Sequence, residues 1–246
     1  MCTLSLVRTP AVWRVACNRD ESPRRARALP PREVRLDDRR ALMPIDPQGG
    51  GTWLGVNDAG LVLAILNKSD PDVPAVGRES RGVIIPELLS ATSAGEARKA
   101  AIELDATRFR SFRLAIIDGQ NLYVVVGDGA TVSEVPVPRD ADTWCAASSG
   151  LGDGVVEPAR IALFEATVLG TSDALDAQDA FHKHRWADRP HMSVDMMRDG
   201  AQTVNVTAVT VLGDAAEMTH MDKITGEQTS SSLRRAAHLQ RAGAKR

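Results

Sequence analysis

MCTLSLVRTPAVWRVACNRDE, residues 1–21, is the stretch of sequence that decides the fold. Two β-prone runs, residues 3–8 and 12–17, flank a Thr-Pro pair of the kind that forms turns, so the sequence predicts a β-hairpin. In an antiparallel pair, the end of the second strand lies opposite the start of the first. We therefore expect residues 18–21 to lie near Cys2.

Cys2 is the candidate nucleophile. Methionine aminopeptidase removes Met1 when the second residue is small, and cysteine meets that requirement. The cysteine would then carry an α-amine with a pKa of about 7.7–8.0 beside a thiol with a pKa of about 8.5. The amine can accept the thiol proton directly or through a water, so the nucleophile and its base would share one residue.

The segment Asn18-Arg19-Asp20-Glu21 brings charged side chains back to Cys2. A carboxylate there could hold the α-ammonium group and orient it. Arg19 could lower the pKa of the thiol or bind a substrate carboxylate. The alternative is a charged surface turn in which Arg19 pairs with Asp20 or Glu21.

The rest of the chain alternates between runs of strands and runs of helices. We expect further strands at residues 53–56, 61–66, 112–117, 122–126, 131–135, 143–147, 204–212 and 217–221. Helices are expected at residues 84–91, 94–104 (capped by Ser93), 157–169 and 172–182. Residues 20–40 and 67–81 are polar and contain proline, and they are interpreted as loops. Segregated runs of this kind are typical of an α+β fold in which two antiparallel sheets have helices outside them.

The composition is that of an ordinary globular protein. The chain has 246 residues, 43% of them hydrophobic, and a net charge of −2, so no overall charge draws it to nucleic acid or to a membrane. We expect a single domain over residues 2–225 and a flexible or weakly docked tail over residues 226–246. We expect no secretory leader, and no run approaches the roughly 20 apolar residues of a membrane helix.

Cysteine and histidine positions bear on metals and on the cell compartment. An odd, sparse set of cysteines argues against a disulfide framework, fits a reducing cytoplasm and offers no CxxC spacing for zinc: Cys2, Cys17 and Cys145. Three neighbouring histidines could bind a metal or haem but lack a helix-spaced pair, so they are interpreted as a polar helix end: His182, His184 and His191. We therefore expect a cytoplasmic protein without a metal or resident cofactor, whose partner is a small-molecule ligand or substrate. The sequence indicates no oligomeric state.

Two motifs carry a resemblance to a known family. The tetrapeptide Asn-Arg-Asp-Glu at residues 18–21, followed by Gly-Gly-Thr-Trp-Leu-Gly at residues 50–55, resembles the NRDE family, which is named for the tetrapeptide. Its eukaryotic members form the transport-and-Golgi-organisation protein 2 group, and the Met-Cys start also matches. The resemblance covers residues 2 to about 66 well, and it continues more loosely through residues 81–82, 144–149 and 201–212. It implies a four-layer αββα fold of the N-terminal-nucleophile hydrolase type.

A more distant resemblance is to the choloylglycine hydrolases and penicillin acylases, which also begin Met-Cys and have an Arg-Asn-x-Asp sequence after the second strand. It implies that Asp20, with Asn18, orients the amine. The family Arg falls at Cys17 here, so that Arg19 would have to act from nearby. The Asn-x-x-Gly-Leu…Leu-Asn stretch of those enzymes is matched by residues 57–67, which gives Asn67 the role of oxyanion donor. The alternative for Asn67 is a cap of the turn after a strand.

Two positions depart from the pattern of the distant hydrolases. Ser149 stands where they have an Asn as second oxyanion donor. Residues 202–205 occupy the strand in which they have a catalytic Arg, and Arg198 is the arginine upstream of it. The electrophilic side of the site is therefore incomplete by comparison.

Two functions follow as expectations. The first is a Cys-dependent amidohydrolase or acyltransferase that acts on a C–N amide bond, with Cys2 as nucleophile, Asp20 and Asn18 orienting its amine and Asn67 holding the oxyanion. The alternative is a non-catalytic trafficking protein on the same fold that binds haem or a lipid or acyl-CoA, as the resemblance to the eukaryotic members implies.

Overall fold

One antiparallel sheet, called sheet A, is built around the N-terminal strand. The computed structural model describes residues 2–69 and 79–236. Strand β1 lies between β10 and β2, and the sheet continues through β12 and β13 to β14, with the short β11 paired to β12. The strands of sheet A are β1 (Cys2–Arg8), β2 (Val12–Glu21), β10 (Thr143–Ser148), β11 (Met197–Arg198), β12 (Ala201–Leu212), β13 (Ala215–Asp222) and β14 (Gln228–Arg234).

The second antiparallel sheet, sheet B, is a meander in which each strand pairs with the next one along the chain. Its order is therefore the order of the sequence, and both edges are formed by its first and last strands. The strands are β3 (Leu29–Leu36), β4 (Arg39–Ile45), β5 (Leu54–Asn57), β6 (Val62–Asn67), β7 (Phe112–Ile117), β8 (Leu122–Gly127) and β9 (Val132–Val135).

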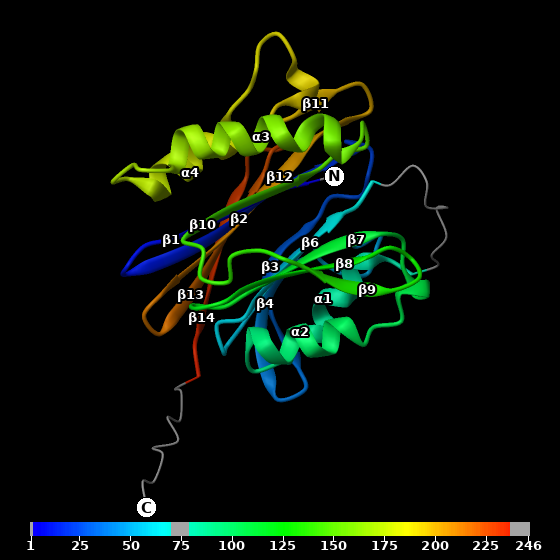
Figure 1. The fold of residues 1–246 in the computed structure, drawn as a ribbon, viewed down its shortest axis with the longest axis vertical. Coiled ribbons are helices and arrows are strands. Elements are labelled where there is room, and N and C mark those ends of the chain that lie inside the picture. Colours follow the sequence, from blue (N-terminus) through cyan, green and yellow to red (C-terminus); the bar gives the residue numbers. More distant parts are fainter. Residues whose placement is uncertain (1, 70–78, 237–246) are drawn as a thin grey trace, which may run out of the picture.

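Helices cover the outer faces of the two sheets, so that the molecule has four layers (Figure 1). Helices α3 (Asp153–Val168) and α4 (Ala174–Lys183) pack on sheet A. Helices α1 (Ile84–Leu88) and α2 (Ala94–Ile102) pack on sheet B. Short 3₁₀ turns complete the list: η1 (Arg81–Val83), η2 (Ala106–Arg108) and η3 (Pro190–Met192). The expected α+β fold with an αββα arrangement is confirmed.

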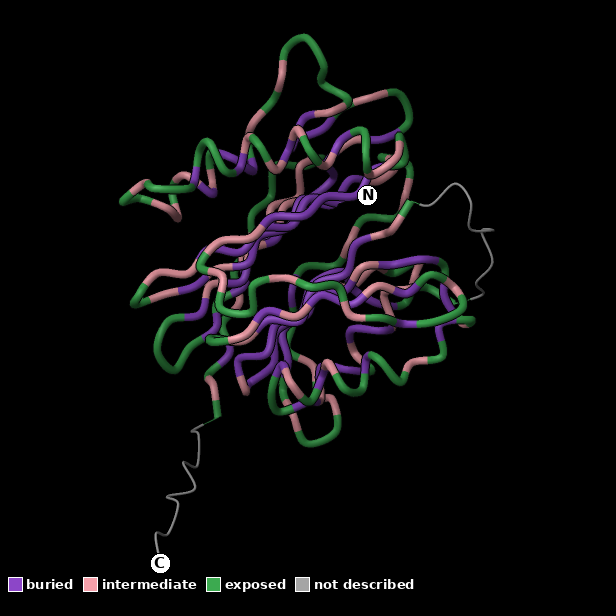
Figure 2. The backbone as a smooth tube through the Cα atoms, in the orientation of Figure 1, coloured by how far each residue is buried: buried purple, intermediate pink, exposed green. Residues whose placement is uncertain are grey.

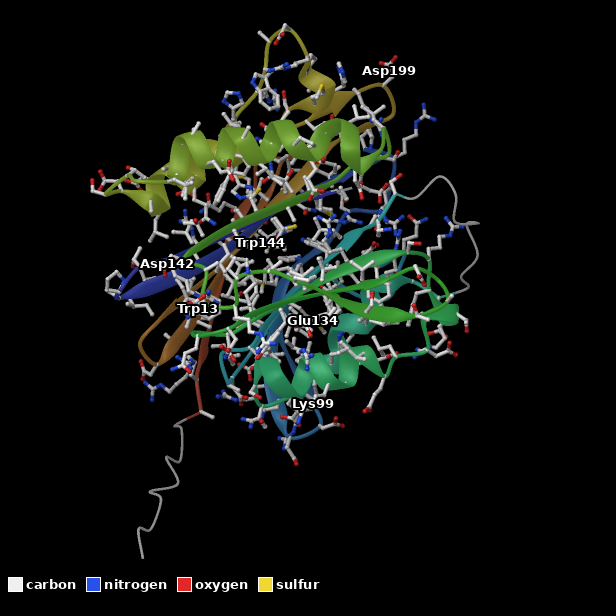
Figure 3. The ribbon with its side chains drawn as sticks, in the orientation of Figure 1. Trp13, Lys99, Glu134, Asp142, Trp144 and Asp199 are labelled. Atoms are coloured by element: carbon white, nitrogen blue, oxygen red, sulfur yellow. The ribbon has the colours of Figure 1, made fainter. Side chains whose placement is uncertain are left out.

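The core lies between the sheets, where the strands are buried along most of their length (Figure 2). Successive side chains of a strand point to opposite faces, and β1 uses this alternation. Leu4 and Leu6 join the main apolar core, whereas Thr3 and Ser5 on the other face bond to residues of α3 and α4. Trp13 and Trp144 lie between the two sheets (Figure 3). Sheet A therefore has one apolar face and one polar face, both buried.

Local sequence signals account for several elements. The hairpin of β1 and β2 forms as predicted, with Cys2 opposite Arg19. Helix α2 begins after Ser93, whose hydroxyl accepts from the backbone nitrogen of Glu96 at 3.2 Å, as the capping prediction required. Glu96 in turn accepts from the backbone nitrogen of Thr92 at 2.7 Å, one residue before the cap. Helix α3 starts at Asp153, four residues before the predicted start.

The prediction of a loop over residues 20–40 is wrong. Strand β2 continues to Glu21, and β3 and β4 occupy most of the remaining segment. Strand β3 is an edge strand, and edge strands tolerate both prolines and outward-facing charges. The prolines and arginines that looked like loop composition are therefore edge composition. Of the other expected loop, residues 67–81, the part from 70 to 78 lies outside the described residues.

The expected tail over residues 226–246 is also corrected in part. Residues 228–234 form β14, which pairs with β13 along its whole length, and Leu233 is 1% exposed. The serine-rich composition of this segment fits an edge strand with one buried side chain. Residues 237–246 lie outside the described part of the chain. Over the residues that the structure describes, no helix is long and apolar enough to cross a membrane.

Candidate active site

Cys2 is the first residue of β1, an interior strand of sheet A, and its neighbours come from both adjacent strands. Arg19 of β2 and Ser148 of β10 stand directly opposite Cys2 in the sheet. Directly opposed residues share a face, so all three side chains point toward sheet B. The backbone nitrogen of Cys2 donates to Ser148 Oγ at 3.1 Å. Cys2 is 6% exposed, and it is therefore fixed in position at the margin of a pocket.

A pocket of about 160 Å³ opens at Cys2 between the two sheets. Four of the five predicted site residues line it: Cys2, Arg19, Asp20 and Asn67. Further walls come from sheet B and its loops, among them Asp46, Thr52, Trp53 and Arg81. The sequence prediction thus brought together residues that are up to 65 positions apart, and the fifth residue, Asn18, lies elsewhere.

Asp20 is held by a buried network. Its Oδ1 accepts from the hydroxyl of Thr203 at 2.6 Å, and its Oδ2 lies 3.5 Å from the guanidinium of Arg160. Arg160 also donates to Thr3 Oγ1 at 2.5 Å and to the carbonyl of Ser193 at 2.6 Å. Burial raises the pKa of Asp20, while Arg160 and Thr203 favour its charged form. The carboxylate is therefore oriented by three elements, β12, α3 and β2 itself.

A β-bulge explains how Thr203 reaches Asp20. The pairing of β12 with β2 shifts between Thr203 and Asn205, so Thr203 faces Asp20 while Asn205 faces Arg19. A bulge places one extra residue in a strand and re-aims its neighbours. Thr203 consequently bonds on the helix side of sheet A, and Asn205 takes the Cys2 side.

Asn18 is turned away from Cys2 and binds α4. Its Nδ2 donates to the carbonyls of His182 at 2.9 Å and Val194 at 2.8 Å. Its Oδ1 lies 2.7 Å from His182 Nδ1, so that nitrogen carries the proton and donates. His182 Nε2 then accepts from Ser5 Oγ at 2.6 Å. These contacts give Asn18 a role in attaching α4 to the sheet in place of the expected role at the Cys2 nitrogen.

The same network corrects the interpretation of His182. It is 3% exposed, and both ring nitrogens are hydrogen-bonded, so it is not part of a solvated helix end. Burial lowers its pKa to about 3, and the nearby Arg14 and Arg160 contribute. The imidazole is therefore neutral at pH 7. Among the described residues, no group of three or more His, Cys, Asp or Glu side chains could hold a metal ion.

Two buried thiols meet in the site. Cys17 lies on the same face of sheet A as Cys2, two residue pairs further along the hairpin. The Cys17 thiol donates a hydrogen bond to the Cys2 sulfur, which lowers the pKa of Cys2 to about 6 against the opposing effect of burial. The same bond and burial raise the pKa of Cys17. Cys2 is therefore the thiol that ionises first.

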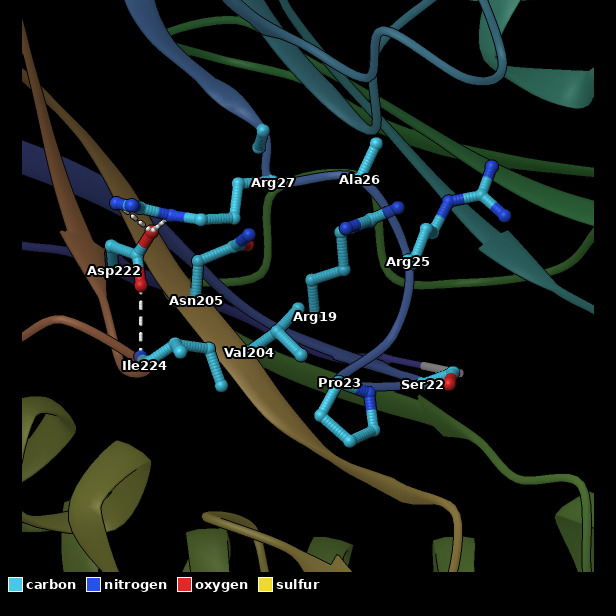
Figure 4. A pocket seen from close by; sticks show the side chains of 11 residues that line it. Arg19, Ser22, Pro23, Arg25, Ala26, Arg27, Val204, Asn205, Asp222 and Ile224 are labelled. Atoms are coloured by element: carbon cyan, nitrogen blue, oxygen red, sulfur yellow. Dashed lines mark hydrogen bonds and ion pairs between the residues drawn. The ribbon is translucent and has the colours of Figure 1, made fainter.

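Arg19 stands beside Cys2 in a charged cluster. Its guanidinium lies 2.9 Å from Asp46 Oδ2 and 4.8 Å from the ring centre of Trp53. Arg25 reaches the same Asp46 oxygen at 2.8 Å. Figure 4 shows Arg19 and Arg25 along a smaller adjoining cavity, where Arg27 pairs with Asp222. Glu21 lies 3.9 Å from Arg19 and 3.8 Å from Arg25, so two carboxylates, Asp46 and Glu21, balance the two arginines.

Of the remaining residues that the sequence pointed to, Asn67 lines the Cys2 pocket, whereas Ser149 and Arg198 do not. Asn67 is the last residue of β6 and lines the pocket opposite sheet A. Ser149 Oγ accepts from the backbone nitrogen of Leu151 at 3.1 Å, so it closes the turn before α3, and Ser148 is the serine at Cys2. Arg198 lies in β11 and is not among the residues that line the Cys2 pocket.

Several residues of the site were missed by sequence reasoning. Arg160 and Thr203 hold Asp20, but one Arg in a predicted helix and a Thr in a strand give no signal of that role. Arg81 lines the pocket, and the Arg81-Gly82 pair was noted only as part of the looser resemblance. Trp53, which belongs to the Gly-Gly-Thr-Trp-Leu-Gly motif, is 4% exposed and also lines the pocket.

A larger cavity of about 420 Å³ lies on the other side of sheet A, beside α4. It is lined by Arg14, Lys183 and Lys223 around a floor of small and apolar residues of β12 and β13. None of the predicted site residues lines it. We assign the candidate active site to the smaller pocket, because that pocket holds the activated thiol.

Comparison with known proteins shows the family of the chain and its fold. A family model described as Transport and Golgi organisation 2 matches residues 2–169. The chain belongs to this family. The segment that matches the Transport and Golgi organisation 2 model includes β1, β2 and the Gly-Gly-Thr-Trp motif. Thr203 lies beyond the end of this segment. No curated protein sequence matches the chain.

Solved structures similar to this Transport and Golgi organisation 2 family member have the N-terminal-nucleophile hydrolase fold. The N-acylethanolamine-hydrolyzing acid amidase ortholog of Caenorhabditis elegans has a TM-score of 0.57 at 10% identity, over 86% of this chain and 100% of that one. The C2A mutant of conjugated bile acid hydrolase from Clostridium perfringens has a TM-score of 0.50 at 13% identity, over 94% and 96%. At these identities the likeness shows the fold.

Proposed function

We propose that the chain is an N-terminal-cysteine amidohydrolase or acyltransferase that acts on a C–N amide bond. The observation that carries the proposal is the position of Cys2: its thiol is activated by Cys17, and it opens on a pocket that Asp20 and Asn67 also line. The solved structures with the same fold include an N-acylethanolamine-hydrolyzing acid amidase ortholog and a conjugated bile acid hydrolase. Because one fold hosts many activities, the residues of the pocket carry more weight than that likeness.

The proposed reaction uses one residue as nucleophile and base. Removal of Met1 converts the Cys2 backbone nitrogen into a free α-amine, which accepts the thiol proton. The sulfur attacks the amide carbonyl carbon and forms a tetrahedral oxyanion. The amine then donates the proton to the leaving nitrogen, the C–N bond breaks, and a thioester remains on Cys2. Water releases the acid, or an acceptor amine takes the acyl group.

The surrounding residues have distinct proposed roles. Asp20, fixed by Arg160 and Thr203, holds the α-ammonium group that appears during the cycle. Asn67 Nδ2 donates to the oxyanion, and such a donor contributes about 3 kcal/mol to transition-state stabilisation in other acyl-transfer sites. Arg19 is a neighbour of Cys2 whose charge favours the thiolate. Asn18 supports the site through α4 and does not contact the reacting atoms.

The first test is the mass of the intact protein, which must lack Met1 for this mechanism. The second is labelling with an amide-mimic electrophile, followed by peptide mapping. We expect label on Cys2 and none on the Cys2→Ala variant, whereas Cys145→Ala, which removes a buried thiol beside α3, labels like the parent. A retained Met1, or equal labelling of Cys2→Ala and the parent, would contradict the proposal.

The alternative of a haem- or lipid-binding trafficking protein stays a prediction. A haem titration followed by absorbance discriminates between the two. No spectral change at micromolar haem would count against haem binding, and a change that persists in Cys2→Ala would place the ligand away from the proposed nucleophile.

A further inference from the structure

Arg81 differs from the other arginines of the Cys2 pocket in its lack of a carboxylate partner. Arg19 and Arg25 share Asp46, as described above. Arg81 donates from its Nη1 to the backbone carbonyl of Ser111 at 2.9 Å, and over residues 2–69 and 79–236 no ion pair is formed by it. Partial removal of a charge from water costs free energy unless a partner compensates it. Within the described residues, Arg81 is therefore a guanidinium of this pocket that no carboxylate contacts directly.

The electrostatic surroundings of Arg81 agree with this. Burial and the neighbouring Arg110 both lower its pKa, while Cys2 and Glu21 act in the other direction without contacting it as ion pairs. An arginine remains protonated in proteins, so Arg81 bears the cost of burial without a directly bonded carboxylate. A bound anion would remove that cost.

The backbone fixes Arg81 at the pocket through the Gly-Gly-Thr motif. The backbone nitrogen of Thr52 donates to the carbonyl of Gly82 at 3.0 Å. At Gly51, an added Cβ would lie 2.3 Å from the carbonyl carbon of Gly82, so only glycine allows the two segments to approach this closely. Ser80 Oγ also accepts from the nitrogen of Gly82 at 3.3 Å. The turn that carries Arg81 is therefore held against the backbone of Gly51 and Thr52, on the side of the pocket opposite sheet A.

We propose that Arg81 binds a carboxylate of the substrate, so that the substrates are amides with an anionic group close to the scissile bond, such as N-acyl amino acids. That the bound anion belongs to a substrate rests on the proposed function. That Arg81 binds an anion rests on the pocket alone. Arg is suited to this task because its planar guanidinium binds a carboxylate through two parallel hydrogen bonds. Arg81 is here a specificity-determining residue, and the bond chemistry remains that of Cys2.

The test compares two alkylating reagents of nearly equal size, iodoacetate and iodoacetamide, at Cys2. Their rates are measured by peptide mapping on the parent, Arg81→Gln and Arg81→Lys, with the exposed Arg24→Gln as a matched control. We expect Arg81→Gln to lower the ratio of the iodoacetate rate to the iodoacetamide rate by about tenfold, as for the loss of one charge-assisted hydrogen bond. Arg81→Lys should retain part of the ratio, and Arg24→Gln should retain all of it. An unchanged ratio in Arg81→Gln, or an equal fall in Arg24→Gln, overturns the proposal.

A second measurement uses the unaltered protein and does not depend on how a variant folds. N-acetylglycine and its neutral analogue N-acetylglycinamide are compared for protection of Cys2 against iodoacetamide. We expect protection by the acid at a concentration at least several-fold lower, and equal protection by both overturns the proposal. Hydrolysis of either compound is followed in the same samples. If neither is cleaved while the anion preference holds, the proposed catalysis fails and the anion site stands.

Discussion

The carboxylate of Asp20 on β2 lies 3.5 Å from the guanidinium of Arg160 on α3, and both side chains are 1% exposed. The pair joins sheet A to its covering helix directly behind the strand that carries Cys2. Removal of one partner from a buried pair leaves a charge without compensation, which costs about 3–5 kcal/mol. We expect Arg160→Met to lower the free energy of unfolding by an amount in this range, measured by urea denaturation.

The control for Arg160→Met is an exposed ion pair in the same protein. Arg27 lies 2.9 Å from Asp222, but its side chain is 55% exposed. Exposed pairs contribute about 0–1 kcal/mol, so Arg27→Gln should change the unfolding midpoint little. Equal losses in the two variants would show that the Asp20–Arg160 pair has no special weight.

The hydrogen bond from Cys17 sets the ionisation of Cys2. Cys17→Ala removes the donor that stabilises the Cys2 thiolate, and the pKa of Cys2 should then rise from its present value of about 6. The measurement is the rate of Cys2 alkylation by iodoacetamide as a function of pH. The parent should gain reactivity as the pH rises through about 6, and the variant should gain it at higher pH. Superimposable profiles would show that Cys17 does not act on Cys2.

Burial of neutral His182 makes stability depend on pH. Its folded pKa of about 3 lies below the ordinary value of about 6.5. Between these values the unfolded chain binds a proton that the folded chain excludes, so the contribution is complete above pH 6.5 and is lost as the pH falls. The expected slope is on the order of 1 kcal/mol for each pH unit. His182→Gln should unfold with a shallower pH dependence below pH 6, whereas the exposed His191→Gln should keep the slope of the parent.

A substitution at Gly51 tests whether the close contact between Gly51 and Gly82 holds the turn that carries Arg81. Gly51→Ala forces its new Cβ against the backbone of Gly82, so the two segments must separate. We expect a loss of stability of about 1–3 kcal/mol, as for other overpacked sites, together with a reduced preference of Cys2 for iodoacetate. Gly154 in α3 is the matched position, because nothing lies within 4 Å of a Cβ added there. Gly154→Ala should be neutral or stabilising, by up to about 1 kcal/mol. A smaller loss of stability in Gly51→Ala than in Gly154→Ala would contradict this role of the contact between Gly51 and Gly82.

Local patterns predicted the parts of the molecule in which one segment determines its own structure. The first hairpin, the Ser93 cap and the meander over residues 112–135 follow from β-prone runs, turn residues and capping chemistry. The return of Arg19 and Asp20 to Cys2 follows from hairpin geometry alone. These features need no information from distant residues.

The parts that could not be predicted depend on contacts between distant segments. Residues 29–36 were predicted as a loop, because their two prolines are unfavourable in most strands. The local sequence does not indicate that this segment lies at a sheet edge, where prolines are tolerated. Asn18 and Asp20 are two residues apart, and both lie on the helix side of sheet A, yet only Asp20 also lines the Cys2 pocket. The difference arises from His182 and the bulge at Val204, which are far away in the chain. Arg160 and Arg81 enter the site through tertiary packing of this kind as well.

Strand β1 pairs with one strand that is near it in the sequence and with one that is far from it. Strand β2 follows within a few residues, but β10, the partner on the other side, starts only at Thr143. Once β10 has docked, Cys2 is 6% exposed and its backbone nitrogen is bonded to Ser148. At 5–20 residues per second, synthesis of the intervening segment takes on the order of 10 s. If Cys2 acts as proposed, removal of Met1 would be easiest in this interval, before Ser148 binds the Cys2 nitrogen.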